Sequence, residues 1–461
     1  MTHVCHSWRE LFTSRPSLWT RLDCKNVDKT KVYIERSKSF PLEISVRFTQ
    51  NTPRREEALV LAIPHIGRLG AFSLNGIPPQ VLPASAKFFS SSVPFLNKLN
   101  INISRKPPPV LPENLFNRDL SSLRELRLGG VITRLPWRGM LNLTTFEFRR
   151  LPGDSILIAQ LLDFLESAPR LRYVKLHNSI PNPGGPPAEK VVSLPHLKEL
   201  SIITEQPHSV LLQHLSIPAG ALLRLEFTFS GLESPIPSYL PNPPNNLCNL
   251  SHTTAMNLCF GPEQRSLRLN GPSGELYMLG NWKRGDSKPR SGTGKFLYSL
   301  NQFDISRTRW LAVTRCDYRP GGFVQMEMWC LYKVIRPMED LRTLTLTRCS
   351  NINFILILNP EKTPSNIVVC PKLEEIAFYI EHPDQLCIEE LLSMVEERAS
   401  RGAKLLAITI VSAGTLALMK EVFQLRRHVS RVECKFDDGP PAWDALPAAR
   451  GLGLERLVGV V

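Results

Sequence analysis

The sequence predicts an α/β protein built as a solenoid, with a curved parallel sheet, helices and loops on its outer side, and a short helical segment at the N-terminus. Three observations predict it. A short apolar phrase recurs eleven times, its copies follow one another at similar spacing, and some segments between them have the apolar periodicity of a helix. The chain has 461 residues, which is long for one compact domain, but solenoids commonly reach this length as a single body.

Each copy of the phrase has an apolar residue at its first, fourth and sixth positions. Alternate side chains of a strand point to the same face, so the fourth and sixth residues enter one core. Successive copies start between 20 residues (Leu123 to Leu143) and 32 residues (Leu341 to Leu373) apart, on either side of one long gap. We expect each copy to form one strand of the sheet, with its three apolar positions buried. The copies begin at Leu69, Leu96, Leu123, Leu143, Leu171, Leu197, Leu222, Leu341, Leu373, Leu405 and Val429.

This phrase resembles the L-x-x-L-x-L phrase of leucine-rich repeats, whose periods are about 20–29 residues. The resemblance implies a leucine-rich-repeat solenoid, in which each repeat supplies one strand and an outer helix or turn. The Asn or Cys that usually follows the phrase in that family is mostly absent here. The repeats are therefore expected to be irregular.

Two connecting segments are predicted to be helices. The first has an apolar stripe at helical spacing from Ile158 to Leu165, and the second has one from Ile388 to Ala399. The remaining connections are rich in proline, which favours extended loops. The predicted N-caps are Asp154 or Ser155 for the first helix and Asp384 for the second, and Gly402 is the predicted C-terminal cap of the second.

The pattern divides the chain into five parts. Residues 231–337 interrupt the repeats and are expected to be an insertion or a set of divergent repeats. They contain strand-like pieces at Ser266–Leu269 and Gly274–Leu279 and a polar, basic run at Asn281–Lys295, which predicts a mobile exposed loop. The five parts are 1–24, a helical segment; 25–230, the first part of the solenoid; 231–337, the irregular region; 338–438, the second part of the solenoid; and 439–461, a C-terminal tail.

The first two dozen residues have their own pattern. Val4, Cys5, Trp8 and Leu11 or Phe12 lie on one helical stripe, and Pro16 then introduces a turn with bulky residues at Leu18 and Trp19. From the residues alone, this segment is a cap that joins a helix to the first repeat. A solenoid needs such a cap, because its terminal repeat otherwise exposes the core.

The same segment resembles the second half of an F-box, the helical motif by which a substrate receptor binds the Skp-type adaptor of a cullin-type ubiquitin ligase. An F-box normally opens with a helix of the type LPxELLxxIFxxL, which falls before Met1, so the F-box is expected to be truncated at its N-terminus. The resemblance implies that the adaptor contacts Val4, Cys5, Trp8, Arg9, Leu11, Pro16, Leu18 and Trp19.

The likeness extends along most of the chain. The segments Val32–Ser37, Met338–Leu344 and Cys370–Ile376 are similar to fungal (basidiomycete-type) F-box proteins with irregular leucine-rich repeats. The resemblance implies a substrate receptor that holds a protein target, whose identity the sequence does not give, on its repeat surface. A leucine-rich-repeat scaffold without adaptor binding is the alternative.

Net charge and hydropathy limit the classes of partner that this protein could have. The net charge is +14, and the basic excess is concentrated only between Met278 and Pro320, which is typical of a solvated loop. A nucleic-acid-associated protein is an alternative that rests on this charge alone. The start of the chain has no apolar signal region, and the longest apolar run, Phe354–Leu358, is too short to span a bilayer. We therefore expect a cytoplasmic or nuclear protein with reduced thiols and no membrane partner.

The sequence contains no recognisable catalytic motif. Gly292–Lys295 differs from a phosphate-binding loop because Pro289 and Phe296 occupy positions that need Gly and Ser or Thr. None of the ten cysteines is spaced as C-x-x-C, and Cys5, which lies between His3 and His6, belongs to the apolar stripe. We therefore expect no catalytic residues, cofactor or metal site, and a non-enzymatic interaction protein.

Overall fold

In the computed structural model, the residues whose structure is described are 6–48, 53–76, 89–103, 108–112, 115–118, 120–133, 139–150, 157–179, 190–204, 209–229, 240–241, 246–261, 264–282, 300, 303–315, 328–349, 351–363, 366–380, 386–412 and 419–436. Within them the protein is α/β, with a large, mostly parallel sheet of seventeen strands and helices between many successive strands. This confirms the predicted class and the parallel sheet. The chain divides into two compact units, residues 1–224 and 225–461.

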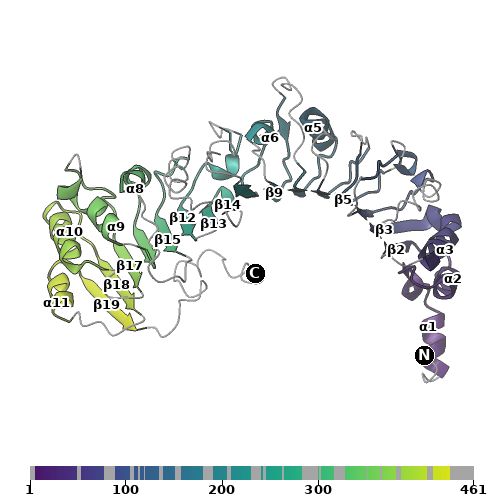
Figure 1. Ribbon diagram of the computed structural model, residues 1–461, viewed down its shortest axis with the longest axis horizontal. Coiled ribbons are helices and arrows are strands. Elements are labelled where there is room, and N and C mark those ends of the chain that lie inside the picture. The colour runs from purple at the N-terminus through teal and green to yellow at the C-terminus, as the bar shows by residue number, and fades with distance from the viewer. Residues whose placement is uncertain are drawn as a thin grey trace. The chain divides into compact units, whose positions relative to one another are not determined.

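Unit 1 consists of parallel strands joined by helices and turns, which lie to one side of the strands (Figure 1). Eight strands pair in chain order, from β1 through β7 and then β9. Its elements are α1 (His6–Thr13), η1 (Pro16–Trp19), β1 (Arg21–Leu22), α2 (Val27–Arg36), β2 (Leu42–Arg47), α3 (Pro53–Ala62), η2 (Ile63–Arg68), β3 (Leu69–Asn75), β4 (Lys98–Asn102), η4 (Leu115–Arg118), β5 (Glu125–Gly129), β6 (Thr145–Arg149), α5 (Ile158–Glu166), β7 (Tyr173–His177), β8 (Val192–Ser193), β9 (Glu199–Thr204), α6 (Ser209–Gln213) and β10 (Leu215–Ser216). The strand β11 (Leu222–Phe229) contains the boundary between the units.

Unit 2 has the same parallel arrangement with one hairpin added. Strands β12, β15, β16, β17, β18 and β19 pair in that order and are all parallel, whereas β13 and β14 form an antiparallel hairpin beside β12. The helices α8 to α11 lie on one side of the strands (Figure 1). Its further elements are η6 (Cys248–Leu250), β12 (Ala255–Phe260), β13 (Gln264–Gly271), β14 (Gly274–Trp282), β15 (Trp310–Arg315), α8 (Met328–Ile335), β16 (Thr343–Thr347), α9 (Asn351–Leu358), η8 (Pro360–Lys362), β17 (Glu375–Ile380), α10 (Ile388–Ser400), β18 (Ala407–Ser412), α11 (Met419–His428) and β19 (Arg431–Phe436).

The irregular region 231–337 contains two strands of the parallel sheet, β12 and β15, in addition to a hairpin. The two strand-like pieces at Ser266–Leu269 and Gly274–Leu279 are the hairpin strands β13 and β14, as the sequence predicts. Residues 283–295 of the predicted mobile loop and the tail 439–461 lie outside the described residues.

The core is built from the apolar positions of the recurring phrase. Leu126, Leu200 and Leu344 are fully buried in β5, β9 and β16. In-register neighbours stack these side chains across the sheet, as Leu126 does with Leu99 of β4 and Phe146 of β6. Two positions differ from the prediction. Leu222 is half-buried, because β11 buries Leu223 instead, and Cys434 of β19 is exposed.

Both predicted helices form, but the predicted N-caps are wrong. Helix α5 begins at Ile158 with Leu157 as its N-cap, whose N–H group donates to the side-chain oxygen of Gln160 at 3.2 Å. Helix α10 begins at Ile388 with Cys387 as its N-cap. Asp154, Ser155 and Asp384 therefore precede the N-cap positions and lie outside the described residues. Gly402 follows α10 with a φ of +77°, as a C-terminal cap requires.

Several strands end with a residue in the left-handed conformation, which turns the chain away from the sheet. Gly130, after β5, has a φ of +60°, and its N–H group donates to the Arg149 carbonyl oxygen of the next strand. Arg150 and Asn178 occupy the same position after β6 and β7. A side chain at residue 130 would overlap the carbonyl oxygen of Ile103, so only glycine fits there.

Replacing Gly130 by alanine is expected to lower the free energy of unfolding by about 2–4 kcal/mol, because left-handed strain and a steric overlap add together. The matched control is Gly220→Ala. Gly220 has a φ of +84° but open space around its Cβ position, so we expect only the left-handed strain of about 1–2 kcal/mol. Urea unfolding followed by circular dichroism measures both, and equal losses would contradict the steric argument.

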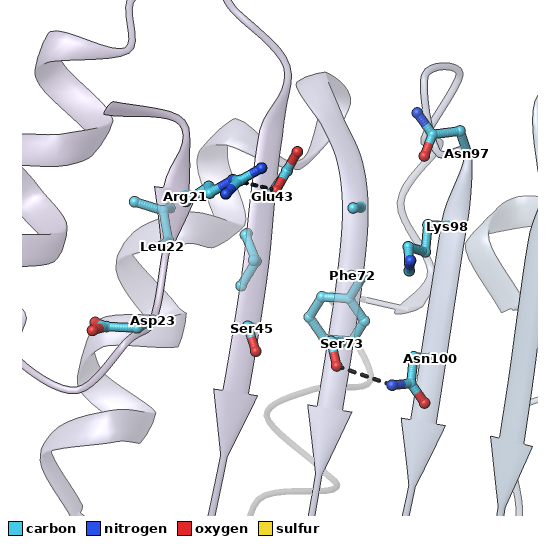
Figure 2. A pocket seen from close by; sticks show the side chains of 12 residues that line it. Arg21, Leu22, Asp23, Glu43, Ser45, Phe72, Ser73, Asn97, Lys98 and Asn100 are labelled. Atoms are coloured by element: carbon cyan, nitrogen blue, oxygen red, sulfur yellow. Dashed lines mark hydrogen bonds and ion pairs between the residues drawn. The ribbon is translucent and has the colours of Figure 1, made fainter. Parts of the chain in front are cut away.

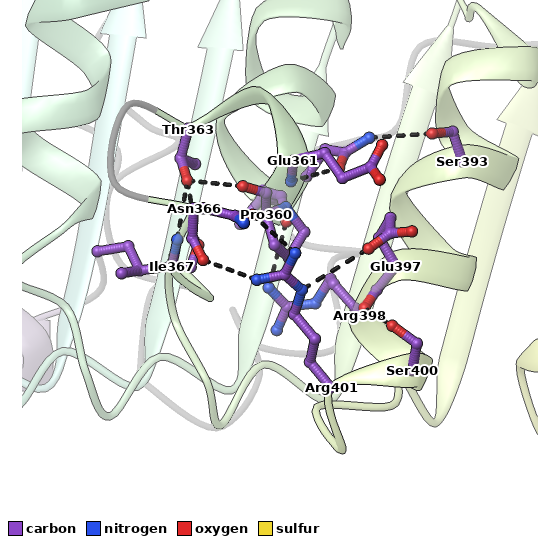
Figure 3. A network of polar contacts seen from close by, with 12 residues as sticks. Pro360, Glu361, Thr363, Asn366, Ile367, Ser393, Glu397, Arg398, Ser400 and Arg401 are labelled. Atoms are coloured by element: carbon purple, nitrogen blue, oxygen red, sulfur yellow. Dashed lines mark hydrogen bonds and ion pairs between the residues drawn. The ribbon is translucent and has the colours of Figure 1, made fainter.

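Unit 2 contains a fully buried arginine, Arg398 of α10 (Figure 3). Its guanidinium group donates to the carbonyl oxygens of Val369 at 2.7 Å and Cys370 at 2.8 Å. Burial lowers the pKa of Arg398 to about 10, so the group is still charged at neutral pH. No carboxylate is among its hydrogen-bond partners, and its charge is therefore balanced by backbone dipoles.

Candidate functional site

The most unusual surface of unit 1 is an exposed apolar patch at the N-terminus. Trp8, Leu11 and Phe12 share one face of α1, at spacings of three and four residues, and Leu18 follows in η1. These four side chains are between 43% and 54% exposed, and the rings of Trp8 and Phe12 stack with centroids 5.9 Å apart. Grouped exposed apolar side chains of this size typically mark a site of protein interaction. We call these four residues the N-terminal apolar surface.

Trp19 attaches α1, which carries most of this surface, to the rest of unit 1. It is buried, its indole N–H donates to the Phe12 carbonyl oxygen at 2.8 Å, and its ring meets Tyr33 of α2 edge-on at 5.0 Å. The guanidinium group of Arg36 lies over the same ring at 4.5 Å. Trp19 therefore connects the end of α1 to α2, in agreement with the joining role that the residues alone predict.

The residues implied as adaptor contacts differ in their exposure. Trp8, Leu11 and Leu18 are exposed, Trp19 is buried, and Pro16 is the half-buried first residue of η1. Arg9 belongs to α1, and Val4 and Cys5 lie outside the described residues. Phe12, which the sequence offers only as an alternative to Leu11, belongs to the same face, and its spacing of four residues from Trp8 is the signal for it.

A second surface is the face of the unit 1 sheet that points away from the core. Most alternate residues of the strands are exposed or half-buried there, whereas Glu147 of β6 is buried, and neighbouring strands place opposite charges side by side. Ion pairs join Arg21 to Glu43 at 3.0 Å, Lys98 to Glu125 at 2.8 Å and Lys175 to Glu199 at 3.2 Å, and Glu147 contacts both Arg127 and Arg149. The charges of this strand face therefore compensate one another within the protein.

A hollow of about 450 Å³ opens on this strand face above β1 to β4 (Figure 2). Ala71 lies in register between Glu43 and Lys98, and its short side chain leaves the space. Glu43 and Lys98 pair outward with Arg21 and Glu125, away from Ala71. Lower on the same strands, the amide of Asn100 donates to the hydroxyl of Ser73 at 3.2 Å. The hollow is open and is lined by both polar and apolar groups, which suits a side chain of a bound protein better than a buried cofactor.

Metal ligands and cysteine thiols bear on the chemistry that the described residues could support. They contain no group of three or more His, Cys, Asp or Glu side chains that could hold a metal ion. Burial raises the pKa of the Cys24 and Cys370 thiols to about 12, which disfavours the reactive thiolate. Cys259 is disulfide-bonded, so the prediction of reduced thiols is wrong for this cysteine. In the described part of the chain, every helix is too short or too polar to cross a bilayer.

Comparison with protein-family models and with curated proteins finds no match to this chain. The assignment of function therefore rests on the surfaces themselves.

Proposed function

We propose that this protein is a non-enzymatic interaction protein, an F-box substrate receptor of a cullin-type ubiquitin ligase built on an irregular leucine-rich-repeat solenoid. The N-terminal apolar surface would bind the Skp-type adaptor, and the repeats would hold a protein target. The N-terminal apolar surface carries the proposal. Trp8, Leu11 and Phe12 are exposed on one face of a short helix, while Trp19 fixes that helix to the first repeat.

The exposed apolar side chains of this segment can supply free energy for binding the adaptor. A few large apolar or aromatic anchors usually supply most of the free energy of a protein interface. Trp8, Leu11, Phe12 and Leu18 provide such anchors, and they are accessible before any partner binds. In the motif that the segment resembles, an earlier helix of the type LPxELLxxIFxxL supplies further anchors to the adaptor.

We predict that the chain as given binds a purified Skp-type adaptor weakly, and that grafting an LPxELL-type helix before Met1 makes the binding tight. In the grafted protein, Trp8→Ala should raise the dissociation constant by about 30-fold or more, because a central aromatic anchor is lost. Isothermal titration calorimetry measures both constants. Trp8 is exposed, so its replacement should leave the unfolding midpoint unchanged.

Trp329→Ala provides the matched control for this titration. Trp329 of α8 is 58% exposed, similar to Trp8, but belongs to unit 2. Its replacement should not affect adaptor binding. Tight binding by the ungrafted chain, abolished by Trp8→Ala, would show that the earlier helix is dispensable. Absence of binding by both proteins would favour a repeat scaffold without an adaptor.

A further inference from the structure

Unit 1 carries unpaired positive charge along the side of its sheet where the strands begin. The charged residues lie in the turns that lead into the strands. Arg124, Arg172 and Lys198 each precede the first residue of a strand, β5, β7 and β9 respectively. All three are exposed, and among the described residues their side chains form no ion pair or hydrogen bond. Arg170, which is also exposed, donates only to the neutral amide oxygen of Asn142 at 3.0 Å. We call these four residues the cationic edge.

Backbone hydrogen bonds place three members of this edge, Arg124, Arg172 and Lys198, in one row. The N–H of Thr144 donates to the Arg124 carbonyl oxygen, that of Arg172 to Thr144, and that of Lys198 to Arg172, at distances of 2.8–2.9 Å. Because neighbouring strands lie about 4.8 Å apart, three steps from Arg124 to Lys198 span about 14 Å. The row is a strip of three cations fixed by the register of the sheet, with the neutral Thr144 between Arg124 and Arg172.

The carboxylates next to this strip in sequence do not form ion pairs with it. Glu125 and Glu199 follow Arg124 and Lys198 directly in sequence, but they pair with Lys98 and Lys175 on the strand face. The strand face therefore compensates its own charges, whereas the edge leaves four cations without a carboxylate partner. An anionic partner could form ion pairs at the edge without breaking any within the protein.

We propose that the cationic edge binds a short acidic segment of the target protein. This inference rests on the proposed function, because it names the class of target that the receptor would hold. An extended peptide rises about 3.3 Å per residue, so about four or five residues cover the 14 Å strip. A nucleic acid fits less well, since its binding usually depends on many phosphate contacts over a larger surface.

The test uses the full chain and a fluorescein-labelled hexaglutamate peptide, followed by fluorescence anisotropy. We expect hexaglutamate to bind, hexalysine not to bind, and the affinity to fall as salt is added, because the pairs are exposed. The triple variant R124Q/R172Q/K198Q should bind hexaglutamate about ten-fold more weakly, since three exposed ion pairs are lost.

A second triple variant controls for net charge. Lys25, Lys31 and Arg54 are exposed cations of unit 1 that lie on and beside α2 and α3, and K25Q/K31Q/R54Q removes the same total charge. It should change the hexaglutamate affinity by less than about two-fold, because screening limits the reach of exposed charges. Equal weakening by both triple variants would overturn the proposal in favour of non-specific attraction.

Two further outcomes would also overturn it. One is equal binding of hexaglutamate and hexalysine. The other is tighter binding of a single-stranded 20-nucleotide DNA than of hexaglutamate, lost in R124Q/R172Q/K198Q, which would assign the edge to nucleic acid. The adaptor titration is independent, because it depends on Trp8 and not on the edge. Loss of hexaglutamate binding with adaptor binding intact would count against this proposal alone.

Discussion

Replacing Leu126 by alanine is expected to lower the free energy of unfolding by about 2–5 kcal/mol. Leu126 lies in the middle of β5 and is fully buried, with Leu99 and Phe146 as its in-register neighbours on the same face. The substitution removes apolar contacts and leaves a cavity. The flanking strands β4 and β6 prevent the cavity from collapsing. Urea unfolding followed by circular dichroism measures the loss as a lower urea concentration at the midpoint of unfolding.

Leu141→Ala is the matched control, since it makes the same change fifteen residues further along the same unit. Leu141 lies in a turn before β6 and is 60% exposed, so its replacement should change the free energy of unfolding by no more than about 0.5 kcal/mol. A similar loss for the two leucines would mean that the recurring phrase does not build the core.

The parallel strands could be predicted because their apolar alternation has a period of two and repeats in register. The strands β12 and β15 were not predicted, and the reason lies in single positions. At the first position of their phrase they carry Thr253 and Thr308, which are as buried as the leucines elsewhere. A hydroxyl group at a buried position removes the apolar signal, although the fourth and sixth positions, such as Met256 and Leu258, keep it.

The turns and the surfaces were less accessible to sequence reasoning. Arg150 adopts a left-handed conformation after β6, and its sequence gives no sign of this, because the hydrogen bond of its N–H group to His177 is formed with the next strand. The apolar stripe of α1 predicts a buried face, yet Trp8 is exposed. Whether a stripe is covered depends on what packs against it, and no local pattern contains that information.

Arg398 shows the same limit for polar residues, because a charged side chain near the end of a helix normally predicts an exposed position. Its replacement by methionine is expected to lower the free energy of unfolding by about 2–4 kcal/mol. The methionine keeps most of the volume. The loss comes from the carbonyl oxygen of Val369, which would remain buried without its donor, and from the Cys370 oxygen, which would keep only the N–H group of Leu373. Arg398→Lys should recover only part of the loss, because one ammonium group does not reproduce the planar fork.

Arg401 is the matched control, three residues further along the chain, at the C-terminal cap of the same helix. Its guanidinium group also donates to a backbone carbonyl, that of Asn366 at 2.7 Å, but the contact is exposed (Figure 3). Water can therefore replace it, and Arg401→Met should cost less than about 1 kcal/mol. Urea unfolding of the three variants beside the parent protein separates the two arginines. If Arg398→Met were as stable as the parent, the carbonyl oxygen of Val369 would have found another donor. Arg398 would then contribute by its volume alone, and its hydrogen bonds would not be what joins α10 to the turn before β17.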